Sequence, residues 1–517
     1  MPLAHLGSRL EGRESLEGES RMQQLSAQDA TFVYLETPHT PMHIGSVAIY
    51  DPSTAPGGFV RFKDILQFIA SRLGGARSFR QRLVRVPFDL DHPYWIEDPE
   101  FDIEFHVRHI ALPKPGDWRQ LCIQVARLHA RPMDLTKPLW EFTVVEGLDN
   151  IEGLPPGCFA LVSKVHHAAI DGMSGVEMSS AVHDLSPDAT GVGRPDDWAP
   201  ENMPKVADLL ARSYFNNLVQ PMRVMETIGR SLPGMAKLGV SVGKGDVSLS
   251  GARPAPKTRF NGKVSAHRVW DAVPFPLKEV RAIKDAVPGA TVNDVILTIV
   301  GGALRTYLSD KDELPRDTMT AMAPISVRGE GDKGALGNQV SAMVVGLGTQ
   351  VEDPLERLRF VHGEASNSKA MTNAVGAKNL ADYSQLIPSG LAGLAARLYT
   401  RVGAANAHAP VYNCVVTNVP GSRVPLYFAG ARMLAMYGTA PVFDGMGLIC
   451  PVYSYGDTIA VSFTADRAML PDPDAFADAL RASFEALRGR AMQPPSVPPV
   501  VGNDNAAKKP RQRKGAK

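Results

Sequence analysis

Two adjacent histidines, His166 and His167, are followed by Asp171 four residues after the second, and then by Gly172. An imidazole has an ordinary pKa near neutrality, so it can accept and return a proton within one reaction cycle. A carboxylate one helical turn away can hold the local geometry, and glycine permits a close backbone approach. The segment therefore predicts a histidine general base that makes a nearby hydroxyl nucleophilic.

The two histidines are expected to play different parts. Residues 159–165 form a short apolar run typical of a buried strand, which delivers both histidines at its end. Because strand side chains alternate, only one of the two rings can face a given cleft. We assign His167 as the base and give Asp171 a structural role rather than a proton relay.

Two other interpretations of the pair remain. One ring could be a core histidine and the other a surface histidine, which is the usual reading of a lone histidine. The pair could also bind a metal, but adjacent side chains do not share a face, and no third His or Cys has suitable spacing. We therefore expect neither a metal nor a cofactor.

Composition limits the class of protein. The chain has 517 residues, enough for two or more domains, with 44% hydrophobic and 21% charged residues, as in soluble globular proteins. The net charge of +1 gives no reason to expect a nucleic-acid partner. The four cysteines are far apart, which suits a reducing cytoplasm. No apolar run reaches the length of about 18 residues that a transmembrane helix needs.

Pattern divides the chain into five segments. They are a disordered extension (1–21), a first subdomain (22–185), a crossover linker with amphipathic helices (186–259), a second subdomain (260–490) and a disordered basic tail (491–517). Strands are expected over 44–50, 101–110, 142–146, 159–165, 318–327, 340–347, 413–417 and 459–464. Helices are expected over 59–73, 118–129, 292–307 and 472–488. This mixture predicts an α/β fold.

The histidine segment resembles the motif of the CoA-dependent acyltransferase superfamily, which includes chloramphenicol acetyltransferase and peptide-synthetase condensation domains. Further segments, in order along the chain, are similar to the bacterial wax ester synthase/acyl-CoA:diacylglycerol acyltransferase family. They are Leu25-Ser26-Ala27-Gln28-Asp29, Pro41-Met42-His43-Ile44-Gly45, Pro138-Leu139-Trp140, Asn293-Asp294, Pro324-Ile325-Ser326-Val327-Arg328, Gly337-Asn338 and Asn418-Val419-Pro420-Gly421. The resemblance spans about 22–490.

The resemblance implies two chloramphenicol-acetyltransferase-like subdomains, each a mixed sheet covered by helices, with a channel between them. It implies transfer of a long-chain acyl group from acyl-CoA, a substrate rather than a cofactor, to diacylglycerol or a fatty alcohol. His167 would act as base, without a covalent acyl-enzyme. Asn293 is a candidate for binding the oxyanion or substrate, and its alternative is a helix-start residue. Arg328 is a second candidate for binding the oxyanion or substrate. It could also pair with Asp171, and its alternative is a solvated loop charge.

Two further matched segments are expected to be structural. Trp140 should be packed in the core, because aromatic residues dominate cores. Residues 418–421 are interpreted as a turn.

Two other motifs are rejected. The segment 239–243 fits G-x-S-x-G, but a glycine-rich loop follows it instead of a helix. The segment 329–334 fits G-x-G-x-x-G, but it opens no clear helix, and its two acidic residues would repel a pyrophosphate.

We expect a cytoplasmic protein that binds peripherally to a membrane or lipid-droplet surface and leave its oligomeric state open. Residues 203–238 carry five basic side chains against two acidic ones, and the tail is basic. A solvated linker and tail are the alternative. Two other functions also stay open: a condensation-type acyltransferase with another donor or acceptor, and a non-catalytic lipid-surface binding protein.

Overall fold

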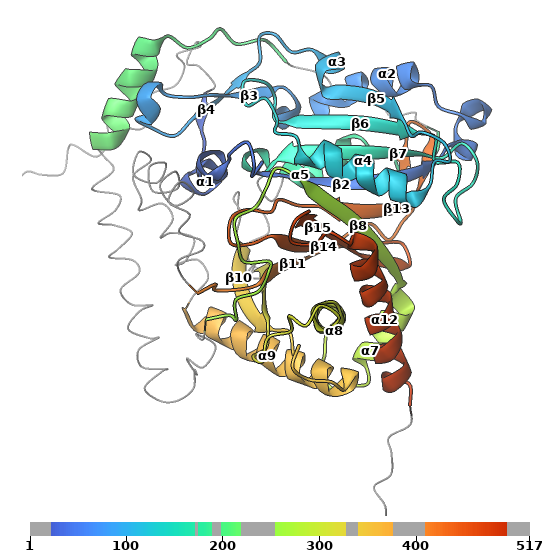
Figure 1. Ribbon diagram of the computed structural model, residues 1–517. Coiled ribbons are helices and arrows are strands. Elements are labelled where there is room, and N and C mark those ends of the chain that lie inside the picture. Colours follow the sequence, from blue (N-terminus) through green and yellow to red (C-terminus); the bar gives the residue numbers. More distant parts are fainter. Residues whose placement is uncertain are drawn as a thin grey trace, which may run out of the picture.

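The computed structural model describes residues 22–170, 174–188, 198–218, 254–326, 340–375 and 409–493. These residues form two six-stranded mixed sheets with covering helices, and a smaller three-stranded sheet (Figure 1). The expectation of an α/β fold with two helix-covered mixed sheets is confirmed.

The first large sheet carries the histidine segment on one of its two central strands. Its order is β12-β13-β2-β7-β6-β5. The strands span Tyr427–Phe428 (β12), Ala431–Thr439 (β13), His43–Asp51 (β2), Phe159–His166 (β7), Trp140–Glu146 (β6) and Val107–Ala111 (β5). β7 pairs antiparallel with both β2 and β6, and this places His43 directly opposite His166.

Two strands of the first sheet come from the far end of the sequence. β13 pairs antiparallel with β2, with Thr439 opposite Gly45, and β12 extends the sheet beyond β13. The expected division into subdomains 22–185 and 260–490 assigns β12 and β13 to the second subdomain, whereas both strands belong to the first sheet. We call this an exchange of strands between the subdomains. Gly45 allows it, because a Cβ there would lie 2.1 Å from the Ser163 carbonyl oxygen and 2.7 Å from Thr439 Oγ1. The two subdomains are therefore interleaved rather than sequential.

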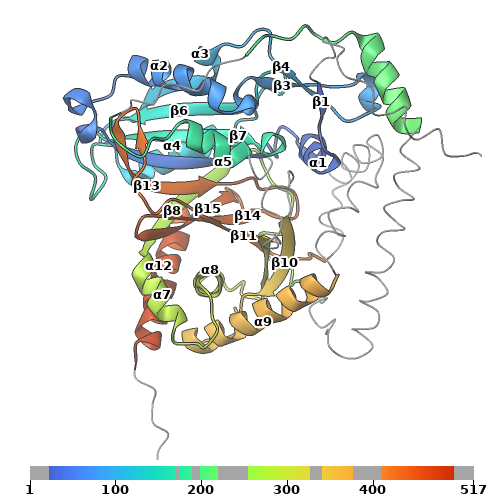
Figure 2. The same cartoon turned by 180° about the vertical axis from the view of Figure 1, so that it is seen from behind.

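Helices cover the first sheet on both faces. Their bounds are Ala27–Leu35 (α1), Phe62–Arg72 (α2), Trp118–Ala130 (α4) and Ser174–Ala181 (α5). Side chains of α1, α2 and α5 share one core with the sheet. Side chains of α4 share another core with the opposite face and with Trp270 of the second sheet. α4 therefore contacts both sheets. It covers one face of the first sheet and lies in front of it in Figure 1 and behind it in Figure 2.

The second large sheet has the order β10-β9-β11-β14-β15-β8. Its strands span Val340–Gly346 (β10), Thr320–Ser326 (β9), Cys414–Pro420 (β11), Leu448–Tyr455 (β14), Thr458–Asp466 (β15) and Arg268–Pro276 (β8). The helices that pack on it span Leu277–Lys284 (α7), Val292–Ser309 (α8), Pro354–Val375 (α9) and Pro473–Ala491 (α12). The small sheet combines Gln23–Gln24 (β1), Tyr94–Glu97 (β4) and Gln81–Val84 (β3).

Two local expectations differ from the structure. The strand expected over 101–110 begins only at β5, because Asp102 caps a one-turn helix, α3 (Ile103–His106). Residues 418–420, interpreted as a turn, are strand, since they continue the parallel pairing of β11 with β14. The helix expected over 292–307 is confirmed as α8, and it contains Gly301 and Gly302. A Cβ on Gly301 would lie 2.2 Å from the Leu347 carbonyl oxygen, so glycine permits this close packing.

The crossover linker is described only in part. Residues 206–218 form a helix beside the small sheet. The basic stretch from 219 onward, both rejected glycine motifs and the tail from 494 onward lie outside the described residues. Within the part of the chain that the structure describes, no helix is both long enough and apolar enough to span a bilayer.

Candidate functional site

The histidine pair lies where β7 ends and a single 3₁₀ turn, η6 (His167–Ala169), begins. His166 is the last residue of the strand and is completely buried. His167 is only partly buried. The end of the strand thus separates the two rings into an inner one and an outer one.

Both ring nitrogens of His166 have partners. Nδ1 accepts from the Ala168 N–H at 3.1 Å, which leaves Nε2 as the protonated nitrogen. That N–H donates to Glu36 Oε2 at 2.6 Å. His166 is therefore a fixed, neutral ring with no nitrogen left for chemistry.

Glu36 is the residue of the site that the sequence analysis missed. It follows α1 directly, and 130 positions separate it from His166. The same oxygen, Oε2, also accepts from the Met42 N–H at 3.3 Å. The only local indication of its importance was its position shortly before the Pro41–Gly45 segment. That segment resembled the family, but no structural role for it followed from the sequence. Glu36 holds this segment and the histidine pair together.

The ring of His167 stacks on Phe32 of α1, with centroids 3.8 Å apart and planes inclined by 13°. Its Nδ1 is buried beside its own backbone carbonyl and makes no hydrogen bond with another described residue. Burial lowers the pKa of His167 to about 4, although its own backbone carbonyl partly offsets the shift. The ring is thus neutral at physiological pH, and its free nitrogen lone pair can accept a proton, although burial makes it a weaker base than an imidazole in water.

Backbone groups fix the position of the pair. The His167 N–H donates to the Met42 carbonyl at 2.8 Å, and the His166 N–H donates to the Leu139 carbonyl at 2.9 Å. Trp140 is fully buried, and its indole N–H donates to the Phe79 carbonyl at 2.8 Å, as expected of a packing residue. The Pro138–Trp140 segment therefore supports the histidines through its backbone.

A second group of buried histidines lies behind the pair. His43 donates from Nε2 to the His129 carbonyl at 2.6 Å, and His129 donates from Nε2 to the Ala440 carbonyl at 2.9 Å. Burial lowers the pKa of His129 to about 3 and that of His43 well below its usual value. The nearby Lys164 ammonium contributes to both shifts and is itself held by Glu141 at 3.2 Å. These rings are structural donors that must stay neutral.

The buried neutral histidines predict a loss of stability in acid. The unfolded chain takes up these protons below pH 6.5, whereas the folded chain resists until the pH nears the lowered pKa values of His43, His129 and His167. The free energy of unfolding should therefore be highest above pH 6.5 and fall as the pH drops. Thermal melts between pH 4.5 and 7.5 measure this dependence.

A single substitution tests this origin of the acid sensitivity. His129→Gln can still donate to the Ala440 carbonyl, and its melting temperature should fall less in acid than that of the wild type. His39→Gln, at an exposed side chain, should leave the dependence unchanged. Equal slopes for the wild type and the His129 variant would contradict this assignment.

Of the remaining predicted site residues, the structure describes only Asn293. Asn293 lies in the first turn of α8, in the second subdomain, and makes no hydrogen bond with His166 or His167. Its neighbour Asp294 forms a capping box with Thr291 and accepts from His362 Nδ1 at 3.0 Å. The helix-start interpretation therefore describes the position of this segment. Asp171, Gly172 and Arg328, together with the suggested pairing of Arg328 with Asp171, lie outside the described residues.

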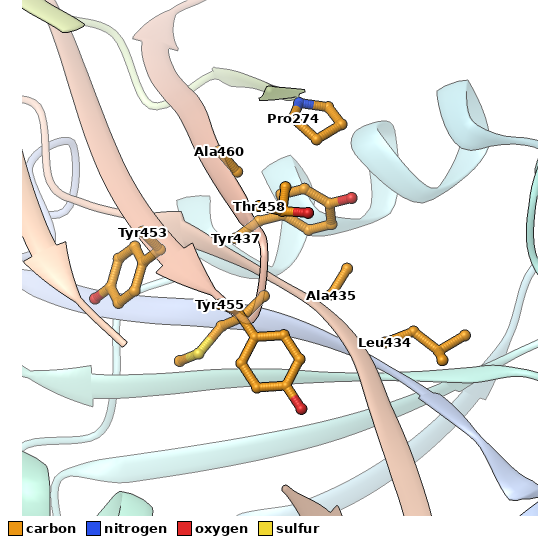
Figure 3. A pocket seen from close by; sticks show the side chains of 9 residues that line it. Pro274, Leu434, Ala435, Tyr437, Tyr453, Tyr455, Thr458 and Ala460 are labelled. Atoms are coloured by element: carbon orange, nitrogen blue, oxygen red, sulfur yellow. The ribbon is translucent and has the colours of Figure 1, made fainter. Parts of the chain in front are cut away.

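A cavity of about 130 Å³ lies between strands β8, β13, β14 and β15. Tyr437, Tyr453 and Tyr455 face it (Figure 3). The cavity includes neither histidine of the pair, nor Phe32 or Glu36. On β13, Tyr437 faces Val47, whereas the site is at the His43 end of β2, about 13 Å along the strand at about 3.3 Å per residue. The cavity is thus separate from the candidate site.

Comparison with known families covers most of the chain. Residues 25–296 match the wax ester synthase/diacylglycerol acyltransferase catalytic domain, and residues 336–488 match the C-terminal domain of the same family.

Individual relatives agree over nearly their full length. Two proteins of Mycobacterium tuberculosis strain H37Rv, provisionally named diacylglycerol O-acyltransferases Rv2285 and Rv1760, are 33% and 31% identical to this chain. They align over 91% and 90% of it and over 100% and 91% of their own lengths.

Solved structures show the same architecture. The wax ester synthase/diacylglycerol acyltransferase from Marinobacter aquaeolei VT8 aligns with a TM-score of 0.63 and 27% identity, over 91% of this chain and 100% of its own. The first condensation domain of the CDA synthetase aligns with a TM-score of 0.52 and 15% identity, over 92% of this chain and 97% of that one, a likeness of fold. The chain therefore belongs to the wax ester synthase/diacylglycerol acyltransferase family of acyltransferase enzymes.

Proposed function

We propose that this protein transfers a long-chain acyl group from acyl-CoA to the hydroxyl of diacylglycerol, of a fatty alcohol, or of both, with His167 as general base. The observation that supports this most is the state of the His167 ring. It is neutral, partly accessible and stacked on Phe32, while its neighbour His166 is fully committed to hydrogen bonds. Membership of the family supports the substrate class.

In the proposed reaction, His167 accepts the proton of the acceptor hydroxyl through Nε2, since Nδ1 is buried beside its own backbone carbonyl. The oxygen attacks the thioester carbonyl and forms a tetrahedral oxyanion. This intermediate collapses to the ester and expels the CoA thiolate, which takes the proton from His167. The ring ends neutral, and no acyl group is bonded to the protein. General base catalysis typically contributes about 10²–10⁴-fold, so orientation and oxyanion stabilisation must supply the rest.

A side-by-side assay tests this function. Purified protein is given labelled palmitoyl-CoA with either dioleoylglycerol or hexadecanol, and the esters are separated and counted. We expect ester formation with at least one acceptor, and release of CoA in equal amount. Transfer only from an acyl carrier protein thioester would indicate the condensation-type alternative. Lipid binding without transfer from either donor would indicate a binding protein.

We further propose that the protein meets its water-insoluble substrates at a membrane or lipid-droplet surface. The helix over 206–218 turns Leu209 and Ser213 inward but exposes Tyr214, Phe215 and Leu218, whose exposed fractions are 66%, 64% and 63%. Asn217 of this helix donates to the Leu90 carbonyl at 2.9 Å, which fixes it beside the short turn η5 (Pro87–Asp89).

The turn η5 supports the same surface. Phe88 there is 90% exposed and has a φ of 61°, in the left-handed region that bulky residues rarely adopt. An exposed aromatic side chain suits insertion into the boundary between headgroups and acyl chains. Lys205, directly before this helix, and Arg212 within it can approach anionic headgroups.

Replacing Phe88 and Phe215 together by serine should weaken binding to vesicles that contain phosphatidylserine. Burial of an aromatic side chain is worth roughly 1.5–3 kcal/mol, so we expect a loss of affinity of at least about 10-fold. Flotation with such vesicles at low and high salt measures this. The matched control is Phe59→Ser, which changes another exposed phenylalanine. Unchanged flotation of the double variant would exclude this surface.

A further inference from the structure

We propose that Arg268, a residue of the second subdomain, positions the histidine pair of the first subdomain by holding the turn that carries Glu36 and Met42. Arg268 begins β8, and its guanidinium donates from Nη2 to the carbonyl of His39, 229 positions earlier in the chain. This inference rests on the proposed role of His167.

The turn is a closed unit with His39 near its tip. The backbones of Thr37 and Thr40 bond to each other in both directions, at 3.4 and 3.0 Å, and their hydroxyls are 2.7 Å apart. Glu36 at its start bonds His166, and Met42 at its end accepts from the His167 N–H. A displacement of the tip of this turn would therefore move both histidines, each through its own hydrogen bond.

The arginine is held rigidly on its own side. Its side chain is almost fully buried, Nη1 donates to the carbonyls of Ser265 and His267, and Asp466 Oδ2 is 3.8 Å away. Asp466 is fixed in turn, since it accepts from the Ser265 N–H and hydroxyl at 2.6 Å each. The tip of the turn is thus attached to the end of β15 and the start of β8.

A buried cation is expensive to keep, and the ion pair of Arg268 with Asp466 is a long one, at 3.8 Å. Burial lowers the pKa of Arg268 to about 10, so the guanidinium still carries its charge at neutral pH. If Arg268 only stabilised the start of β8, its hydrogen bonds to the carbonyls of Ser265 and His267 would be sufficient. The bond to His39 crosses between subdomains and reaches the site, and this makes it a positioning contact.

The chain offers a matched control. Arg357 is also buried, burial likewise lowers its pKa to about 10, and it also donates to backbone carbonyls, namely those of Gly348, Val351 and Glu352. All three lie in its own subdomain. Arg268→Met and Arg357→Met therefore remove comparable buried guanidiniums, only one of which is bonded to the turn that carries Glu36.

The first measurement is steady-state acyl transfer. For Arg268→Met we expect kcat to fall by about 10- to 100-fold, because small misplacements of a catalytic group have effects of this size, while the KM for palmitoyl-CoA stays within about threefold. Arg268→Lys, which keeps one donor and the charge, should recover part of kcat. Arg357→Met should lower the melting temperature but keep kcat. Equal kcat values for Arg268→Met and Arg357→Met would overturn the proposal.

The second measurement does not depend on activity. Amide hydrogen exchange should be faster at Met42 and His167 in Arg268→Met than in the wild type, and unchanged there in Arg357→Met. Unchanged exchange at these positions would also overturn the proposal. If the wild type transfers no acyl group, the proposed function fails, whereas exchange still reports on the attachment. If Arg268→Met does not fold, Arg268→Lys and Thr37→Val, which opens the turn from within, serve in its place.

Discussion

Replacing His167 by alanine should lower kcat for acyl transfer by about 10²–10⁴-fold and leave the fold intact. The ring is only partly buried, its Nδ1 bonds to no other described residue, and its backbone N–H bond to Met42 survives the change. The loss should therefore fall on the chemical step rather than on stability. Radiolabelled acyl incorporation gives kcat, and a thermal melt checks folding.

The pH profile gives an independent test of the same ring. Because burial lowers the pKa of His167 to about 4, the base stays unprotonated well below the usual histidine range. The kcat/KM of the wild type should thus show no loss attributable to this ring between pH 7.5 and 5.5. A full loss with a midpoint near 6.5, or a His167→Ala variant with wild-type kcat, would contradict the assignment.

Replacing Glu36 by alanine should have the second large effect. It leaves the His166 Nε2–H and the Met42 N–H without their acceptor, and each unsatisfied buried donor costs about 1–3 kcal/mol. We expect a lower melting temperature together with a fall in kcat of roughly 10- to 100-fold, because both histidines lose a fixed neighbour.

Two further variants test whether the effect of Glu36→Ala comes from the loss of its hydrogen bonds. Glu36→Gln keeps an oxygen that can accept from both donors, so most of the stability should return. Glu313→Ala removes a partly exposed carboxylate paired with Arg259, and such surface pairs contribute about 0–1 kcal/mol. A Glu36→Ala variant that melts and turns over like Glu313→Ala would show that the His166–Glu36 bond has no consequence.

Local patterns made much of the fold predictable. The helix expected from Thr291 onward forms α8, and the capping box of Thr291 with Asp294 explains its start. The strand expected at 159–165 extends by one residue to include His166. In each case neighbouring residues alone determine the element, through periodicity or a cap, so the sequence pattern is sufficient.

Long-range pairing could not be predicted in this way. Glu36 meets His166 only because β2 and β7 lie side by side, and neither residue carries a mark of the other. The strand nature of residues 418–420 depends on pairing with β14, which overrides the turn preference of Asn and Pro. The sequence thus pointed to the histidine pair but not to the residues that hold it.

The exchange of β13 into the first sheet also constrains how the chain is made. Until the ribosome has added the residues of β13, one edge of β2 has no neighbouring strand. An unpaired strand edge can pair with another chain and so promotes aggregation. The first sheet therefore cannot be completed until nearly the whole polypeptide has been translated. A gene fragment that ends before residue 431 should give insoluble product, and co-expression of the missing piece should rescue it.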